Sequence, residues 1–335
     1  MKKILTFILF ISLFGLFGCS KNKGFTKTIY VFDTTVTITI YDGVEENVDD
    51  IIEILNDVHK LTDAYNTYYG ITNVKSINDG IKAGQTRFKV DGDLATMLSF
   101  TNNWPVAIHE GIDYKNYIMF GVGELTNLWK DAISKKQLPD PDKINQIVQD
   151  IKDEKYNYGL SRPDLWVEEG SKVQFDLGSV AKGYAAHKVY DYLYTQGINN
   201  YLIDLGQSTI LLGEKADGSG FNVAVNGTDF VFKGLKNCCV CTASILEQNM
   251  EIDGKVYHHI IDLSTGYPTN TYDTVVVIQD SYYFYADLNC TYLMIHPDDA
   301  EALWQAFEYG HCTSFFFKDG ELSTSVGNGY ITRTK

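Results

Sequence analysis

Apolar and polar residues alternate where the globular part of the chain begins, and the spacing then becomes helical. Between Thr28 and Tyr41 the apolar side chains share one face at a period of two, which predicts a strand pair or one long strand. Residues 48–65 instead carry apolar positions three and four apart, which predicts an amphipathic helix. The residues on the predicted strand face are Tyr30, Phe32, Val36, Ile38 and Ile40.

The rest of the chain mixes both periods without a regular strand–helix repeat. Asp253-Gly254 and Asp319-Gly320 each lie between strand-like runs, as hairpin turns do. Because hairpins are common and no Pro-, Gly- or Ser-rich linker divides the chain, we expect one α+β domain with mixed or antiparallel sheets flanked by helices. Helices are predicted near 91–103, 120–133, 142–153, 179–195, 282–295 and 298–309, and strands near 164–175, 201–204, 209–212 and 221–226.

The first residues have the pattern of a bacterial lipoprotein signal peptide. Lys2 and Lys3 precede an apolar run that ends at Gly18-Cys19 and is too short to span a bilayer comfortably. We expect cleavage of residues 1–18, lipidation of Cys19, a tether over 19–27 and one domain over 28–335. The protein would then be extracytoplasmic and lipid-anchored to the cell membrane. An ordinary signal peptide with an incidental Cys, or an uncleaved anchor, are the alternatives.

The net charge excludes one class of partner. Lys and Arg total 28 against 43 Asp and Glu, a formal charge of -15, so the chain has no general attraction for nucleic acid. An anionic membrane surface would repel it as well, so membrane attachment requires a specific anchor such as the lipid on Cys19.

The other cysteines do not have the pattern of a disulfide framework, because their number is odd. Cys-Cys-Val-Cys has no second cysteine pair, which argues against a zinc site. We expect small buried side chains in strands and a helix. These cysteines are Cys238, Cys239, Cys241, Cys290 and Cys312.

Asp176-Leu177-Gly178-Ser179-Val180-Ala181-Lys182-Gly183 predicts a strand end, a turn and a helix that carries Lys182 in its first turn. Free backbone N–H groups at a helix N-terminus together with a nearby cation form a natural site for an anion such as a diphosphate. The glycine spacing of a Walker loop is absent. The alternative is a plain strand–turn–helix junction with a surface lysine.

Tyr257-His258-His259-Ile260-Ile261-Asp262 follows the Asp253-Gly254 turn. Strand alternation would place His259 and Ile261 on one face and His258, Ile260 and Asp262 on the other. Two histidines and a carboxylate indicate a metal site or acid–base chemistry. The alternative is a hydrogen-bonded histidine pair at a strand end.

Asp287 and Thr291 are four residues apart in a helix-like run, so they share a helix face. A carboxylate and a hydroxyl are hard oxygen ligands, which suit Mg²⁺ better than zinc. The alternative is a helix cap or an ordinary side-chain hydrogen bond.

Together these segments resemble the ApbE family, the FAD:protein FMN transferases. The resemblance rests on Asp176–Gly183, Leu202–Gly206, His259–Pro268 and Ala286–Thr291, in that order. The N-terminal half is similar in Phe32-Asp33-Thr34-Thr35 and in Tyr68, ten residues before Asn78. A further run is registered on Gly123, Leu125 and Trp129, which places Tyr117-Ile118-Met119 at a pocket motif of the family.

The resemblance implies FAD bound in an extended form with its diphosphate over a metal ion. Lys182 would pair with the diphosphate, and Asp176 would lie along the FAD. Ser179, through its carbonyl, Asp287 and Thr291 would bind Mg²⁺, and His259 would be the acid–base residue. The flavin or adenosine pocket would be lined by Phe32, Tyr68, Tyr117, Ile118, Met119 and Ile261.

The implied reaction is attack by a Thr or Ser hydroxyl of a target protein on the phosphorus of the FMN half, with AMP leaving. Mg²⁺ and Lys182 would neutralise the charge that develops. His259, or Asp287 beside the metal, would take the hydroxyl proton. The implied partners are flavin-acceptor proteins of extracytoplasmic electron-transfer systems.

Two other functions use the same residues. An FAD pyrophosphatase would release FMN and AMP to water, and an aromatic residue at Tyr68 favours transfer over this alternative. A non-catalytic flavin-binding lipoprotein would not need the Asp287/Thr291 pair. An adhesion or substrate-binding lipoprotein is disfavoured by the three site motifs.

Overall fold

A computed structural model describes residues 24–100, 118–307, 311–327 and 331–333. The predicted signal peptide, Cys19 and Tyr117 lie outside the described residues. The first strand, β1, begins at Phe25, so residues 25–27, which the sequence pattern assigns to the tether, belong to the sheet.

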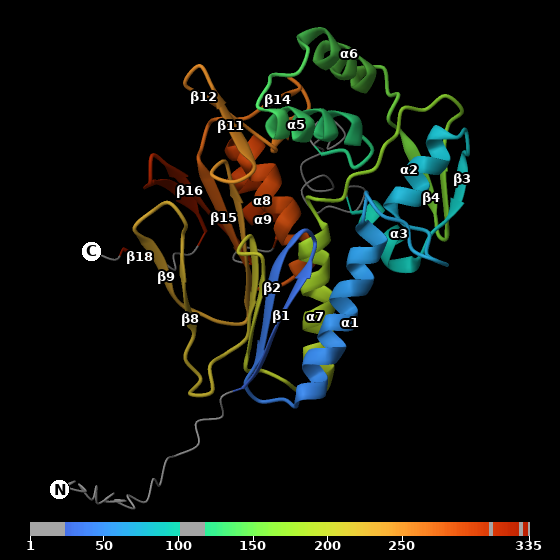
Figure 1. Ribbon diagram of the computed structural model, residues 1–335. Coiled ribbons are helices and arrows are strands. Elements are labelled where there is room, and N and C mark those ends of the chain that lie inside the picture. The colour runs from blue at the N-terminus through green and yellow to red at the C-terminus, as the bar shows by residue number, and fades with distance from the viewer. Residues whose placement is uncertain (1–23, 101–117, 308–310, 328–330, 334–335) are drawn as a thin grey trace, which may run out of the picture.

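The centre of the fold is an eight-stranded sheet in which every neighbouring pair is antiparallel (Figure 1). Its strands, in spatial order, are β1 (Phe25–Val31), β2 (Thr34–Ile40), β6 (Tyr201–Leu205), β7 (Thr209–Leu212), β10 (Cys238–Ser244), β15 (Thr274–Gln279), β16 (Cys312–Lys318) and β17 (Glu321–Val326).

Helices cover one face of this sheet. α1 (Glu45–Thr62), α7 (Ala181–Gln196) and α8 (Ala286–Ile295) bury their apolar stripes against it, and α9 (Ala300–Ala306) follows α8. The short 3₁₀ turn η3 (Tyr283–Tyr285) directly precedes α8, and η4 (Pro297–Asp299) connects α8 to α9. No helix in the described ranges is both long and apolar enough to cross a membrane.

A second layer covers part of the opposite face. It consists of β8 (Phe221–Ala224), β9 (Phe230–Leu235) and β18 (Ile331–Arg333), in the order β18-β9-β8. The strands beneath it supply alternate residues to each core: Leu211 and Val277 face the helices, whereas Leu212 and Val276 face the second layer. Because both faces of these strands are buried, their residues are apolar at successive positions.

A third group of elements, here called the cap, lies above one end of the sheet. It comprises α5 (Gly123–Lys135), α6 (Pro141–Lys152), the hairpin β11 (Asn249–Ile252)–β12 (Lys255–His258) and the pair β13 (Ile261–Asp262)–β14 (Tyr267–Pro268). Trp129 of α5 is fully buried in the cap, stacks on Tyr257 and donates its indole N–H to the Gly266 carbonyl at 2.8 Å.

A smaller flank completes the described fold. It contains α2 (Val74–Lys82), α3 (Gly92–Leu98) and a sheet in the order β3-β5-β4. The three strands are β3 (Arg87–Lys89), β5 (Asp164–Val167) and β4 (Tyr158–Ser161). The α+β architecture predicted from the sequence is confirmed by this arrangement and by the hairpins at Asp253-Gly254 and Asp319-Gly320.

The predicted face of the first strands is wrong in one respect. Phe32 and Asp33 form a two-residue turn with φ of 55° and 56°, so Val31 pairs with Thr34 and the parity of the buried positions changes across the turn. Tyr30 is therefore 73% exposed, while Val31 is buried with Val36. The strands predicted near 164–175 are confirmed for β5 but wrong for residues 168–175, where Gln174 makes only an isolated bridge.

Trp129 should be a major source of stability for the cap. We expect Trp129→Ala to lower the free energy of unfolding by about 3–5 kcal/mol. Trp129→Phe, which keeps a ring but leaves the Gly266 carbonyl without its donor, should cost about 1–3 kcal/mol. Urea unfolding measures both. Trp166→Phe, at a side chain 41% exposed, is the control, and equal midpoints for Trp129→Ala and the control would contradict this role.

Candidate active site

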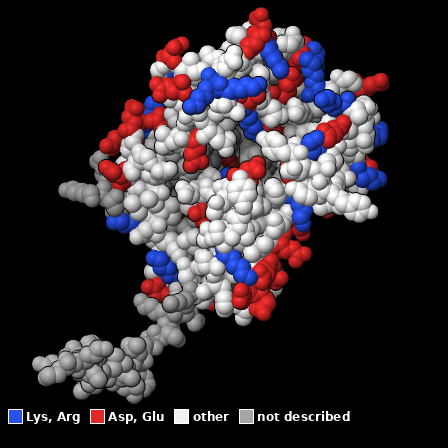
Figure 2. All heavy atoms as spheres, in the orientation of Figure 1, with Lys and Arg blue, Asp and Glu red and all other residues white. Residues whose placement is uncertain are grey.

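A cavity of about 1150 Å³ opens between the sheet and the cap. Figure 2 shows it as a hollow in the middle of the face drawn, with charged side chains around it. Its volume slightly exceeds the usual range for small-molecule pockets, about 300–1,000 Å³. The N-terminus of α7, one face of α8, the turn between β6 and β7, and the segments beside β12 and β13 all contribute to its wall.

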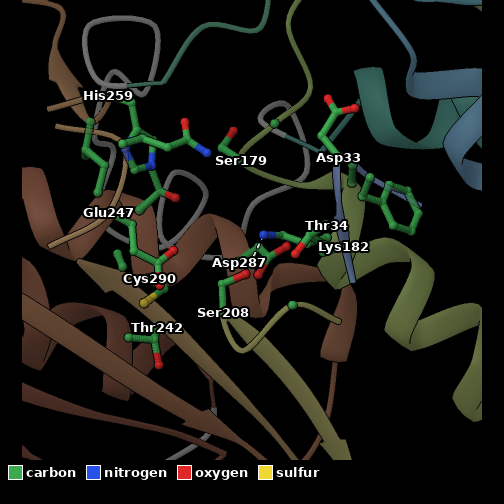
Figure 3. Close-up of a pocket in the computed structure, with 18 of the residues that line it drawn as sticks. Asp33, Thr34, Ser179, Lys182, Ser208, Thr242, Glu247, His259, Asp287 and Cys290 are labelled. Carbon is green, nitrogen blue, oxygen red and sulfur yellow. Dashed lines mark hydrogen bonds between the residues drawn. The ribbon is translucent and has the colours of Figure 1, made fainter. Parts of the chain in front are cut away.

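Lys182 lies in the first turn of α7, as predicted, and its side chain reaches into the cavity (Figure 3). Its ammonium donates a hydrogen bond to the Ser208 hydroxyl, and among the described residues it makes no ion pair. Val180 at the N-cap offers no side-chain cap, but the Ala181 N–H donates to the Leu177 carbonyl at 3.0 Å and the Gly183 N–H donates to Asp287 at 2.6 Å. A lysine without a carboxylate partner in the described structure, at the positive end of a helix, still favours an anion at this wall.

The turn that carries Ser208 requires a glycine. Gly206 has φ of 75°, and a Cβ there would lie 2.4 Å from the Thr34 hydroxyl oxygen. The close packing of this turn on β2 brings Ser208 to Lys182 and Thr209 to Asp287. Sequence reasoning noted Gly206 but missed the contribution of Ser208 and Thr209.

Asp287 is a buried carboxylate at the base of the cavity, 8% exposed. One oxygen accepts the Gly183 backbone N–H of α7 at 2.6 Å, and the other accepts the Thr209 hydroxyl of β7 at 2.6 Å. Both donors are neutral, and the described residues provide Asp287 with no ion-pair partner. The negative charge is thus held in place without being neutralised, which suits a bound cation.

Thr291 also lines the cavity, one turn after Asp287 on the same face of α8, and Ser179 lies in the wall at the turn before α7. These hydroxyl, carboxylate and carbonyl oxygens are the ligand types that Mg²⁺ prefers. No cluster of three or more His, Cys, Asp or Glu with metal-ligand geometry occurs in the described part of the chain. A site with one carboxylate fits Mg²⁺ that is completed by substrate phosphates and water.

Asp176 lines the cavity but is already paired. Its carboxylate accepts Lys130 at 2.7 Å, the Thr126 hydroxyl at 2.9 Å and the Gly178 N–H at 2.9 Å. Burial opposes ionisation, but Lys130 and these hydrogen bonds outweigh it and hold the pKa of Asp176 below its ordinary value. Asp176 therefore fixes the turn before α7 to α5, and Lys130, which sequence reasoning missed, lies in the cavity wall beside it.

The two neighbouring histidines have different environments. His258 is fully buried; its Nε2 bonds to the Thr269 carbonyl and its Nδ1 accepts the Ile260 N–H. The predicted alternation is wrong, because β12 ends at His258 and β13 begins only at Ile261. His259, Ile260 and Ile261 consequently all line the cavity.

His259 has a buried Nδ1 without a hydrogen-bond partner in the described structure. Burial, with a smaller contribution from neighbouring His258, lowers the pKa of His259 to about 4. The imidazole is therefore neutral near pH 7 and can accept a proton. Figure 3 shows His259 on the cavity wall with Glu247, a further lining residue that sequence reasoning missed.

Of the residues predicted to line the flavin or adenosine pocket, one lies elsewhere in the structure. Phe32, Ile118, Met119 and Ile261 line the cavity, but Tyr68 does not. Helix α1 ends at Thr62, and the Asp63 carboxylate then accepts the Tyr65 N–H at 2.7 Å and the Tyr68 hydroxyl at 2.7 Å. This turn places Tyr65, 57% exposed, in the cavity wall and directs Tyr68 to Asp63.

The cysteines of β10 are free and buried, as are Cys290 and Cys312. Burial raises the pKa of the Cys290 thiol well above its ordinary value. Among the cysteines that the structure describes, Cys290 of α8 also lines the cavity (Figure 3).

Comparison with known proteins identifies the family and the fold. The ApbE family model matches residues 32–314. An FAD:protein FMN transferase of Treponema pallidum is 30% identical over 168 residues, which cover 45% of this chain and 46% of the relative. One of Haemophilus influenzae is 24% identical over 297 residues, 80% of both chains. The matches to the T. pallidum and Klebsiella pneumoniae relatives span about half of their lengths.

Solved structures share the fold. The flavin transferase ApbE from Vibrio cholerae superposes with a TM-score of 0.68 at 20% identity, covering 92% of this chain and 98% of that one. The apo flavinyl transferase ApbE from Pseudomonas stutzeri gives 0.70 at 20% identity, covering 91% and 94%.

Thr209 should control how the Asp287 carboxylate is presented to a metal. Thr209→Val keeps the shape of the side chain but removes one of the two donors to Asp287. Loss of such a supporting hydrogen bond typically weakens metal binding by about 10–100-fold. We expect that loss in a Mn²⁺ titration followed by electron paramagnetic resonance in the presence of FAD. Thr209→Ser, which keeps the donor, is the control, and equal affinities for Thr209→Val and wild type would rule out this role.

The His259 environment should make the fold acid-sensitive in a defined window. The unfolded chain binds a proton on this ring at its ordinary pKa of 6.5, whereas the folded chain binds it only near pH 4. The unfolded state thus holds more protons in between, so stability falls as pH decreases from about 6.5 to 4. We expect His259→Asn to reduce this slope in unfolding experiments. An unchanged slope would show that His259 is not buried as a neutral ring.

Proposed function

This chain belongs to the ApbE family, and on that premise we propose that it transfers FMN from FAD to a Thr or Ser hydroxyl of acceptor proteins, with Mg²⁺ as cofactor and AMP as the second product. One observation supports this most strongly. A buried carboxylate without a counter-charge, Asp287, and a lysine without a carboxylate partner, Lys182, line the same large cavity in the described structure.

The residues present fit a magnesium ion. Asp287, Thr291 and the Ser179 carbonyl would hold it, since they offer hard oxygens and Asp287 lacks a cationic partner among the described residues. When bound, Mg²⁺ would stabilise negative charge on the phosphoryl oxygens, an effect usually worth several kcal/mol.

The chain's own residues would bind FAD through its charge and its rings. Lys182, which lies at the positive end of α7, would hold the diphosphate. Phe32, Met119 and Tyr65 offer aromatic and flexible apolar surface for a flavin or adenine ring. Asp176, already paired with Lys130, would keep the turn before α7 rigid rather than contact the phosphates.

The chemical step is a phosphoryl substitution. The acceptor hydroxyl oxygen forms a bond to the phosphorus of the FMN half, and the bond from that phosphorus to the bridging oxygen breaks. AMP leaves with that oxygen and its electron pair. The hydroxyl proton moves to a base, for which His259, a neutral imidazole on the cavity wall, is better suited than Asp287, whose oxygens accept other donors.

One argument from the sequence for transfer to a protein hydroxyl instead of water does not hold in the structure. Tyr68, the residue taken from the sequence to favour transfer, lies outside the cavity lining. The proposal of transfer is supported instead by the names of the relatives over their matched segments.

We further propose that the chain is a lipoprotein anchored through Cys19 on the outer side of the cell membrane and that its acceptors are electron-transfer proteins there. The lysines, apolar run and Gly18-Cys19 at the N-terminus support this location. A net charge of -15 is consistent with attachment by a lipid rather than by basic residues.

Removing the Asp287 carboxylate should abolish transfer. We expect Asp287→Ala to reduce the rate by at least about 10²-fold, because it removes the charged metal ligand. The assay combines the protein with FAD, Mg²⁺ and a flavin-acceptor domain, and detects in-gel flavin fluorescence and a mass gain of one FMN. Asp131→Ala, at an exposed carboxylate of α5, is the matched control.

Undiminished labelling by Asp287→Ala would refute the metal assignment. Release of free FMN without a labelled acceptor in the wild-type reaction would show a pyrophosphatase instead of a transferase.

A further inference from the structure

The cavity continues past Lys182 and Asp287 to the second layer of the fold. There Asn222, Val223 and Ala224 of β8, followed by Asn226, line it. If one face of a strand lined a cavity, only every second residue would contact it, because successive side chains point to opposite faces. Three consecutive lining residues mean that β8 presents its edge, and therefore its backbone, to the cavity.

That edge is open in the described structure. β8 is the last strand of the order β18-β9-β8, with β9 as its partner on one side. The Val225 N–H donates to the Phe230 carbonyl of β9 at 3.0 Å. N–H groups alternate in direction along a strand, so the Ala224 N–H points away from β9, toward the open side.

The floor beside this edge is a sheet face. Leu202 and Asp204 of β6 and Ile210 of β7 line the cavity at alternate positions. Leu202, Ile210 and Val223 are only partly buried, where the apolar core beneath the second layer ends. The second layer thus stops at β8, and the neighbouring face of β6 and β7 is left without a covering strand in the described part of the chain. We call this region, residues 202, 204, 210, 222–224 and 226, the β8 lobe.

Given the transfer of FMN proposed above, we propose that the β8 lobe binds the acceptor protein as an extended segment that pairs with β8 and continues the second layer. Such strand addition uses main-chain hydrogen bonds for affinity and alternate side chains for selectivity. Because β8 borders the same cavity as Lys182 and Asp287, the added strand leads its hydroxyl residue to the phosphate side of the site.

The lining chemistry restricts the segment. Side chains that face the floor contact Leu202 and Ile210, which favours small or apolar residues at every second position. The carboxylates of Asp204 and Glu247 lie in the same cavity, so acidic residues next to the hydroxyl residue are disfavoured and neutral or basic ones are accepted. The partner is therefore an exposed, extended, non-acidic loop or terminus that carries Thr or Ser.

The first test removes the edge donor. Ala224→Pro deletes the outward N–H, while the Val225 bond to β9 remains, and proline is tolerated on edge strands. Ala224→Val keeps the N–H and is the matched control at an exposed side chain. We expect Ala224→Pro to raise the KM for the acceptor about tenfold or more, with an unchanged Kd for FAD and an unchanged melting temperature. The KM of Ala224→Val for the acceptor should lie well below that of Ala224→Pro, because the outward N–H remains.

Each other outcome has a defined meaning. Transfer by the wild type with an unchanged acceptor KM in Ala224→Pro would overturn the strand addition and leave the transferase standing. A raised Kd for FAD in Ala224→Pro would show that the β8 lobe holds part of FAD. If the wild type is a dimer and Ala224→Pro is a monomer, the edge of β8 pairs with a second copy of this chain and not with the acceptor. Hydrolysis of FAD without transfer by the wild type would refute the proposed function itself.

The second test leaves the enzyme unchanged, so it holds even if Ala224→Pro fails to fold. An acceptor peptide is N-methylated at one backbone position at a time on both sides of its Thr. We expect FMN transfer to be lost at every second position on one side, the period of a paired strand. Uniform tolerance, or loss without that period, would overturn the proposal.

Discussion

The site depends on the way the Asp287 carboxylate is held. A buried charge is costly unless it is hydrogen-bonded, and here the Gly183 N–H of α7 and the Thr209 hydroxyl of β7 supply both bonds at 2.6 Å. Gly183 favours this approach, since a Cβ there would lie 3.2 Å from the Asp287 Cβ, closer than most Cβ contacts. These two contacts bind α8 to α7 and to the sheet, and they place the carboxylate beside the lysine at the start of α7.

The rest of the cavity is arranged around that point. On one side the cap, held by buried Trp129, supplies the wall with His259 and Ile261. On the other side the second layer ends at the open edge of β8. The cavity thus borders both the cap, where we propose that FAD binds, and the edge of β8, where we propose that the acceptor binds.

Local sequence signals predicted the parts of this structure that local forces determine. Helix α1, the start of α7 at Lys182, the shared face of Asp287 and Thr291, and the hairpin turns follow from periodicity and turn chemistry. Contacts between distant segments were not predictable from those patterns. Thr209 looks like an ordinary strand residue, and Tyr65 and Tyr68 look alike until the hydrogen bonds to Asp63 distinguish them. Two-residue turns and strand breaks also change which face is buried, as at Phe32 and His259.

The central claim is that the Asp287 carboxylate is a metal ligand at the reacting phosphates. The most direct measurement is anomalous diffraction from crystals of the protein soaked with FAD and Mn²⁺. We predict one strong manganese peak within bonding distance of the Asp287 carboxylate and the Thr291 hydroxyl, in contact with the diphosphate of FAD. A diphosphate bound at Lys182 with no peak at Asp287, or with the peak at another group of residues, would contradict the claim.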